Sequence, residues 1–192
     1  MSNSININGL CQKLLGQDLG TNEHGQAGRR LENLVENWGL PVNRGVGCDI
    51  EILGLELKSR DLDATSAQNV ATMTPRQVVD TDYEDSVVFE KFQQQLRVFT
   101  RKHIVVAADI YDFSQEGIQD LIKNAYETGR GKIAQHWHID PEQMPAYVYG
   151  SEYGYWERIG GGRSYTFRIN PGAYDTLERM AKSTFANLFE YA

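Results

Sequence analysis

The sequence predicts an α/β (α+β) fold, in which a mixed β-sheet is flanked by helices. Two observations support this class. Apolar residues recur at helical spacing in residues 23–39 and 114–129, whereas short segments of alternating apolar and polar residues lie between and after them. With 192 residues, 41% of them hydrophobic, the chain is long enough to bury its own core. We therefore expect residues 1–192 to form a single domain, in which residues 140–192 can build a C-terminal lobe.

The first helix is expected in "EHGQAGRRLENLVENWG", residues 23–39. Its apolar residues follow one another at spacings of four, three and four, which is typical of an amphipathic helix. Gly39 and Pro41 end the pattern. Glu32 would lie on the flank of the apolar stripe, which consists of Ala27, Leu31, Leu34 and Trp38.

Two short strands are expected next, in "CDIEIL" and "LELKSR", joined at Gly54 as in a tight hairpin. Successive side chains of a strand point to opposite faces. Asp49 and Glu51 would therefore share one face of the first strand, and Glu56 and Lys58 one face of the second. The aliphatic residues between them would provide a rigid, buried support.

The remaining elements follow from local pattern and turn residues. Residues 61–85 are expected to be a long acidic loop that can move over a bound ligand, with a strand at "NVATMT" and a short helix after Pro75. Ser114 is a plausible N-cap of the helix in residues 114–129, and Gly129 should end it. The other expected elements are a helix in "SVVFEKFQQQL", two strands bent at Lys102 and His103, three strands around "AYVYG", "YGYWERIG" and "RSYTFRIN" with a turn at "GGG", and a final helix after Pro171.

Composition excludes several classes of protein. The longest apolar stretch is interrupted by Asp109 and is far shorter than the roughly 20 residues of a membrane span. The N-terminus has no basic region followed by an apolar core, so we expect a cytoplasmic protein. Cys11 and Cys48 form neither a disulfide framework nor a metal-ligand cluster, which suits a reducing compartment.

The net charge of −7 argues against a wholly basic nucleic-acid-binding protein, but charge is unevenly distributed. Residues 61–100 hold seven acids against three bases, a net of −4. Residues 155–170 hold three arginines against one glutamate, a net of +2. A polyanion could be bound locally there, although these arginines could equally form a solvated sheet face.

Asp49, Glu56 and Lys58 indicate the chemistry. Two carboxylates on adjacent strands repel each other, and a divalent cation relieves that repulsion. Oxygen ligands of this kind suit Mg²⁺, which keeps several waters and takes one or two carboxylates; Mn²⁺ can substitute. A metal-bound water beside Lys58 could attack a phosphodiester. The pattern therefore predicts a hydrolytic phosphodiesterase site.

Asp49 followed by "ILGLELKSR" resembles the PD-(D/E)XK nuclease motif, in the variant of the MutH mismatch-repair endonuclease and its type II restriction-enzyme relatives. "GQAGRRLENLV" is similar to that family's early helix, and "SVVFEKFQQQLRVF" to the segment with its second active-site lysine. "YWERIGGGRSYTFRINPGA" is similar to its C-terminal DNA-contacting hairpin. Cys48 stands where the proline of the motif would be.

The resemblance implies a restriction-endonuclease-like fold, whose two lobes form a DNA cleft. It assigns Mg²⁺ binding to Asp49, Glu56 and the main-chain carbonyl of Leu57. Glu32 would support a second ion or a metal-bound water, with Glu36 as the competing residue on the same helix and Glu51 as a further acid that could assist. Lys58 would position the nucleophile, and Lys91 would contact the scissile phosphate. Candidates for DNA contact are Arg60, Arg101, Lys102, Arg158, Arg163 and Arg168.

We therefore expect a Mg²⁺-dependent endonuclease that hydrolyses double-stranded DNA at specific sites, as a type II restriction enzyme or a nicking enzyme. A monomer carries one site and would nick; a duplex break requires a homodimer or two successive nicks. A MutH-like mismatch-repair nicking enzyme is the alternative within this class. A catalytically silent DNA-binding subunit of a partner protein would be indifferent to Lys58→Ala, and a plain interaction module would show no salt-dependent DNA affinity.

Overall fold

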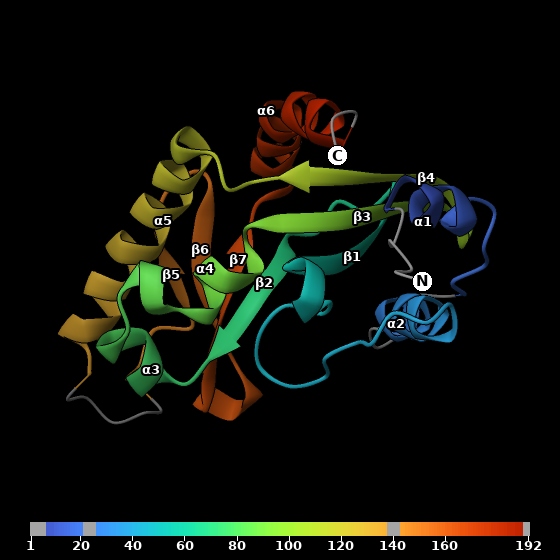
Figure 1. The fold of residues 1–192 in the computed structure, drawn as a ribbon. Coiled ribbons are helices and arrows are strands. Elements are labelled where there is room, and N and C mark those ends of the chain that lie inside the picture. Colours follow the sequence, from blue (N-terminus) through green and yellow to red (C-terminus); the bar gives the residue numbers. More distant parts are fainter. Residues whose placement is uncertain (1–6, 21–25, 138–142, 190–192) are drawn as a thin grey trace. The chain divides into compact units, whose positions relative to one another are not determined.

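The computed structural model describes residues 7–20, 26–137 and 143–189 (Figure 1). The chain divides into two compact units: Met1–Ala64 with Gln94–Tyr111, and Thr65–Gln93 with Asp112–Ala192. The predicted mixed class, with helices flanking β-structure, is confirmed, but the described strands form two sheets and not one. Residues 140–192 fall within the second unit, which also contains residues 65–93 and 112–139.

The first unit contains a three-stranded sheet with the order β1-β3-β4. Its strands are β1 (Leu55–Asp61), β3 (Gln94–Arg101) and β4 (Ile104–Asp112), whose last residue already belongs to the second unit. β1 pairs with β3 in parallel. Lys102 and His103 connect β3 to β4, and both have positive φ angles of 48° and 70°, so the predicted bend is confirmed. The helices of this unit are α1 (Ile7–Leu14) and α2 (Gln26–Asn37), which packs on β1.

The second unit contains an antiparallel sheet with the order β2-β7-β6-β5. α5 lies along β5 and β6 (Figure 1). The predicted strands at residues 69–74, 146–150, 153–160 and 163–170 are confirmed, as are the helices after Pro75 and Pro171. The bounds are β2 (Gln68–Met73), α3 (Pro75–Asp80), α4 (Val87–Lys91), α5 (Glu116–Gln135), β5 (Tyr147–Tyr149), β6 (Gly154–Ile159), β7 (Ser164–Ile169) and α6 (Pro171–Phe189).

The core of each unit follows from its strand pattern. In the first unit, Leu55 and Leu57 of β1 are paired with Gln94 and Leu96 of β3, and both leucines of β1 are buried. In the second unit, Trp156 of β6 packs edge-to-face on Tyr126 of α5, with ring centroids 5.2 Å apart. Aromatic pairs of this kind add to the stabilisation from apolar burial.

The predicted hairpin of residues 48–60 is only half correct. β1 is a strand, but "CDIEIL" is not, because Glu51–Leu53 form a short 3₁₀ turn. Ile50 and Leu55 exchange two backbone hydrogen bonds of 2.8 and 3.1 Å around this turn. Gly54 closes it at φ 59°, a conformation that glycine adopts without strain. The tight turn at Gly54 is therefore confirmed, whereas the shared strand face of Asp49 and Glu51 is wrong.

Three helix predictions also need correction. The helix expected in "SVVFEKFQQQL" ends at Lys91, and Gln94 onwards forms β3, because pairing with β1 outweighs the local helical pattern. α5 continues through Gly129 to Gln135, and its N-cap is Gln115, not Ser114. In α2 the buried apolar residues are Ala27, Leu31 and Val35, so the stripe is rotated away from Leu34 and Trp38.

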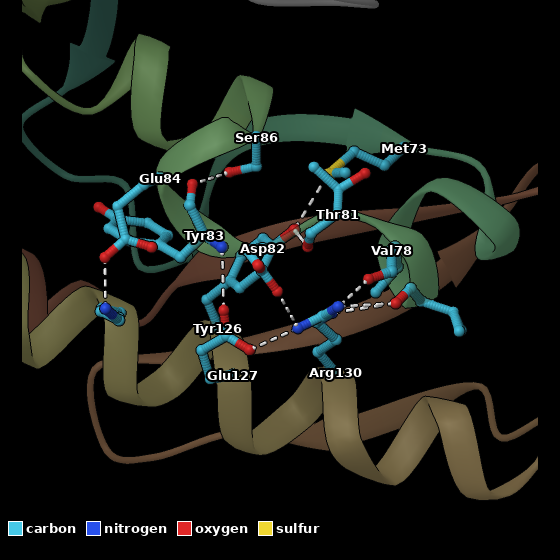
Figure 2. A network of polar contacts seen from close by, with 12 residues as sticks. Met73, Val78, Thr81, Asp82, Tyr83, Glu84, Ser86, Tyr126, Glu127 and Arg130 are labelled. Carbon is cyan, nitrogen blue, oxygen red and sulfur yellow. Dashed lines mark hydrogen bonds and ion pairs between the residues drawn. The ribbon is translucent and has the colours of Figure 1, made fainter.

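The acidic segment that was expected to move is held against α5 within the second unit (Figure 2). Arg130 donates hydrogen bonds to the main-chain oxygens of Val78 and Val79 at 3.0 and 2.8 Å and forms an ion pair with Asp82 at 2.9 Å. Glu127 accepts from the main-chain N–H of Tyr83 at 2.9 Å. Glu84 pairs with Lys123. Residues 78–84 are therefore fixed by contacts that this sequence pattern does not reveal.

Candidate functional site

Asp49 and Glu56 are brought together by the turn between them. Because Ile50 pairs with Leu55 as an antiparallel bridge, the residues just outside this pair lie opposite each other. The Asp49 carboxylate accepts a hydrogen bond from the main-chain N–H of Leu57 at 2.8 Å. The Glu56 carboxylate accepts one from the main-chain N–H of Asp49 at 3.3 Å. The two acids are thus adjacent, although only one of them is on a strand.

Glu56 and Lys58 form an ion pair on β1. Lys58 Nζ lies 2.9 Å from Glu56 Oε1. The Glu56 side chain is 2% exposed and that of Lys58 is 22% exposed, so the acid is buried and the amine opens toward solvent. A buried carboxylate is tolerated only when it is paired and hydrogen-bonded, and Glu56 has both kinds of partner. The prediction that Glu56 and Lys58 share a strand face is confirmed.

Two further polar residues lie on the same face, on β3. Glu56 is the register partner of Gln95, and Lys58 is the register partner of Arg97. Partners in a β-ladder point to the same face of the sheet. Gln95 and Arg97 are both fully buried, and Arg97 Nη1 donates to Gln95 Oε1 at 3.0 Å. Arg97 also lies over the ring of Phe99, with 5.9 Å to the ring centroid. The polar face therefore extends across both strands.

The opposite face of these strands is apolar. Leu55, Leu57, Leu96 and Val98 are buried there. This pattern explains why charged residues can occupy the other face without loss of the strands, since the aliphatic face supplies the burial that holds β1 on β3. Polar and apolar residues alternate along β3 from Gln95 to Val98, which is the signal that could have identified Gln95 and Arg97 from the sequence. This alternation was missed because the pattern of residues 86–96 predicted a helix.

The early helix places its acids next to Arg44. Arg44 donates to both carboxylate oxygens of Glu36, at 2.8 and 3.0 Å, and its Nε lies 4.0 Å from Glu32 Oε2. These hydrogen bonds lower the pKa of Glu36 and raise that of Arg44. Glu51 is exposed and accepts from the Asn43 side chain at 3.3 Å. Of the three alternative acids, Glu32 and Glu36 thus share a cation, whereas Glu51 lies in the turn.

The expected second lysine, Lys91, is the last residue of α4 in the second unit. Its role at the scissile phosphate stays a prediction. In the first unit, Arg60 donates to the Ala64 carbonyl at 3.4 Å, and Arg101 and Lys102 are exposed at the end of β3.

The C-terminal arginines lie on or next to the β6–β7 hairpin. Arg163 is exposed beside the glycine turn, and Arg158 is half-buried on β6. Arg168 Nε lies 2.7 Å from Glu157 Oε2, in an ion pair without hydrogen-bond alignment. This contact neutralises one of the three arginines that gave residues 155–170 their positive charge. DNA contact by these residues stays a prediction.

The donor set is compatible with Mg²⁺ through two carboxylates. Within the described ranges, no three His, Cys, Asp or Glu side chains are grouped so that they could hold a metal ion. Glu32 therefore does not join Asp49 and Glu56 in a three-acid cluster. Mg²⁺ nevertheless binds proteins through one or two carboxylates, with water in its remaining positions. Asp49 and Glu56 supply that number, and the Leu57 carbonyl remains the predicted third ligand.

No model of a known protein family matches the chain, and no curated protein matches it significantly. Among the described residues, no helix combines the length and apolar character needed to cross a membrane. The site is therefore defined by its own geometry: two adjacent carboxylates, a half-buried lysine, and a buried arginine and glutamine on the neighbouring strand.

Proposed function

We propose that the chain is a Mg²⁺-dependent endonuclease that hydrolyses phosphodiester bonds in double-stranded DNA. The observation that carries this proposal is the apposition of Asp49 with Glu56, together with the 2.9 Å pair between Glu56 and Lys58. A buried acid, Glu56, held beside the half-buried Asp49 with an amine at their edge is costly to fold, and a cation-dependent reaction on an anionic substrate accounts for this arrangement. The restriction-endonuclease-like fold and its DNA cleft belong to the same proposal.

In this reaction, each residue of the candidate site has its own task. Asp49 and Glu56 would hold the cation, and the N–H of Leu57 orients the Asp49 carboxylate. Lys58, held in place by Glu56, donates hydrogen bonds to the attacking water and orients it in line with the phosphorus. As the water oxygen bonds to phosphorus, it gives up a proton to bulk water, the bond from phosphorus to the leaving sugar oxygen breaks, and the leaving oxygen takes up a proton from another water molecule. When bound, Mg²⁺ lowers the pKa of its waters and offsets the charge that develops on the phosphoryl oxygens.

The test is cleavage of supercoiled DNA from several sources in the presence of Mg²⁺. We expect open-circular or linear product with the unmodified chain, loss of at least about a hundredfold in rate with Lys58→Ala, and no product in EDTA. Lys13→Ala is the matched control, because Lys13 is an exposed lysine of α1 in the same unit. Intact DNA on every substrate, with a folded protein, contradicts the proposal.

The product distinguishes the alternatives within this function. Open circles that persist indicate a nicking enzyme, such as one of the mismatch-repair type. Linear DNA indicates a restriction enzyme that acts as a homodimer or by two nicks. Equal DNA binding by the unmodified chain and Lys58→Ala, with no cleavage by either alone and with the activity of a partner protein unchanged by the substitution, indicates a silent DNA-binding subunit.

A further inference from the structure

Arg97 is a buried cation on β3, the strand next to the Glu56–Lys58 pair of β1. It is 1% exposed, and it is the register partner of Lys58 across the β1–β3 ladder. Its guanidinium donates to Gln95, which is in turn the register partner of Glu56. This hydrogen bond holds the Arg97 guanidinium next to Gln95, the residue that is paired with Glu56. Neighbouring strands lie about 4.8 Å apart and Gln95 is paired with Glu56, so the side chain to which Arg97 donates lies beside Glu56.

Four charged groups of this face balance before any ligand binds, and Arg60, half-buried two residues beyond Lys58 on the same face of β1, adds a further positive charge. Asp49 and Glu56 contribute two negative charges, and Lys58 and Arg97 contribute two positive ones. A divalent cation alone would raise the total of these four groups to +2, beside a Glu56 side chain that is only 2% exposed. A phosphodiester that binds with the cation lowers that total again. Charge repulsion inside a protein is only partly screened, so this difference changes affinity.

We propose that Arg97 and Gln95 couple metal binding to substrate binding. The Arg97 charge makes the Asp49–Glu56 pair a weak site for a divalent cation alone, and Gln95 holds the guanidinium in the position where it does so. The anionic phosphate of a nucleic acid offsets the charge, so the site fills when cation and phosphate are both present. This inference rests on the proposed nuclease function and deepens it: Arg97 is a positioning residue that does not touch the reacting atoms.

Mn²⁺ binding without DNA tests this inference directly. The electron paramagnetic resonance signal of free Mn²⁺ is measured as it is titrated with the full chain or with a variant. We expect Arg97→Gln to bind Mn²⁺ more tightly than the unmodified chain by about tenfold or more, because a nearby positive charge is removed. Arg97→Lys keeps the charge and should bind Mn²⁺ like the unmodified chain. Arg29→Gln removes an exposed charge from α2 and should also leave affinity unchanged.

A role of Arg97 in packing alone would not tighten metal binding. Equal or weaker Mn²⁺ affinity in Arg97→Gln, or the same tightening in Arg97→Lys, overturns the inference. If circular dichroism shows that Arg97→Gln does not fold, Arg97→Met replaces it, since methionine removes the charge and suits a buried position. The same tightening is expected, and unchanged affinity overturns the inference.

Two controls separate this inference from the proposed function. Asp49→Asn should weaken the Mn²⁺ binding that is measured by about tenfold or more, which assigns the signal to this site. Cleavage of DNA that depends on Lys58, together with unchanged Mn²⁺ affinity in Arg97→Gln, refutes the coupling and leaves the nuclease function standing. Absence of both Mn²⁺ binding and DNA cleavage in the unmodified chain refutes both.

Discussion

Lys58 of β1 and Arg97 of β3 are register partners, so two cationic side chains lie beside each other on one face of a parallel ladder. Like charges directly across strands destabilise a sheet unless other groups compensate. Glu56 compensates on β1 through its pair with Lys58, and Gln95 accepts a hydrogen bond from Arg97 on β3. These four side chains share one face of β1 and β3, and the predictions about the site follow from their contacts.

Asp49→Asn should separate metal binding from folding. The asparagine side-chain oxygen can still accept the N–H of Leu57, so the turn should persist, whereas loss of a carboxylate should weaken Mn²⁺ binding by about tenfold or more. Glu51→Gln is the matched control, because Glu51 lies in the same turn and is exposed. Titration of Mn²⁺ measures both. Weaker binding in Glu51→Gln than in Asp49→Asn would assign the metal to the turn acid.

Gly129 should be intolerant of any side chain, whereas Gly131 in the same helix should accept one. A Cβ at Gly129 would lie 2.5 Å from Trp156 Cδ1, and nothing lies within 4 Å of a Cβ at Gly131. We expect Gly129→Ala to lower the free energy of unfolding by about 1–3 kcal/mol, as overpacking does. Gly131→Ala should raise it by about 0.5–1 kcal/mol through helix propensity. Urea unfolding followed by tryptophan fluorescence measures both, and equal effects would contradict the packing of α5 on β6.

Arg130→Met should loosen residues 78–84 within the second unit. The substitution removes the donors to Val78 and Val79 and the ion pairs with Asp82 and Glu127. We expect a loss of about 2–3 kcal/mol in the free energy of unfolding, because buried carbonyls lose a charged donor. Arg76→Met is the control, since its pair with Asp80 is exposed and should contribute less than about 0.5 kcal/mol.

Hydrogen exchange gives an independent measure of the same contacts. Amides of residues 78–84 should exchange faster in Arg130→Met than in the unmodified chain, while those of β6 should keep their protection longer. Unchanged exchange in residues 78–84 would show that packing of Tyr83 and Tyr126 alone holds the segment.

Cys11 should react slowly with alkylating agents. Burial, with a smaller contribution from the negative charge of Asp109, raises the pKa of the Cys11 thiol from 9.0 to about 11. Because the thiolate is the reactive form, iodoacetamide should modify Cys11 at pH 8 about tenfold or more slowly than it modifies a free thiol. Mass spectrometry of the peptide that contains Cys11 measures the rate. Asp109→Asn should speed the reaction, and an unchanged rate would exclude the electrostatic contribution.

The same pKa shift predicts a pH dependence of stability. A group whose pKa is raised in the folded state contributes stability that is complete below its unfolded pKa and is lost as pH rises through the folded value. For Cys11 this loss should occur between about pH 9 and pH 11. Comparison of unfolding free energies of the unmodified chain and Cys11→Ala over this range isolates it. If the unmodified chain became more stable relative to Cys11→Ala as pH rises from 9 to 11, the upward shift of the Cys11 pKa would be contradicted.

The sequence by itself determined several local elements and the closeness of Asp49 to Glu56. Alternation in "LELKSR" predicted β1, and glycine marked the turns at Gly54 and residues 160–162. The adjacency of Asp49 with Glu56 followed from the short segment between them. These features depend on contacts within a few residues, which is why pattern and turn chemistry suffice.

Tertiary structure decided what long-range pairing controls. Gln95 and Arg97 became part of the site because β3 aligns with β1 in parallel, and this pairing turned a segment with a helical pattern into a strand. Gly129 did not end α5, because it lies against Trp156 and the absence of a Cβ permits the close contact. Glu32 lies 4.0 Å from Arg44 and does not form a three-acid group with Asp49 and Glu56 among the described residues. Such outcomes depend on which surfaces meet after folding, and burial there outweighs the small propensities that local sequence encodes.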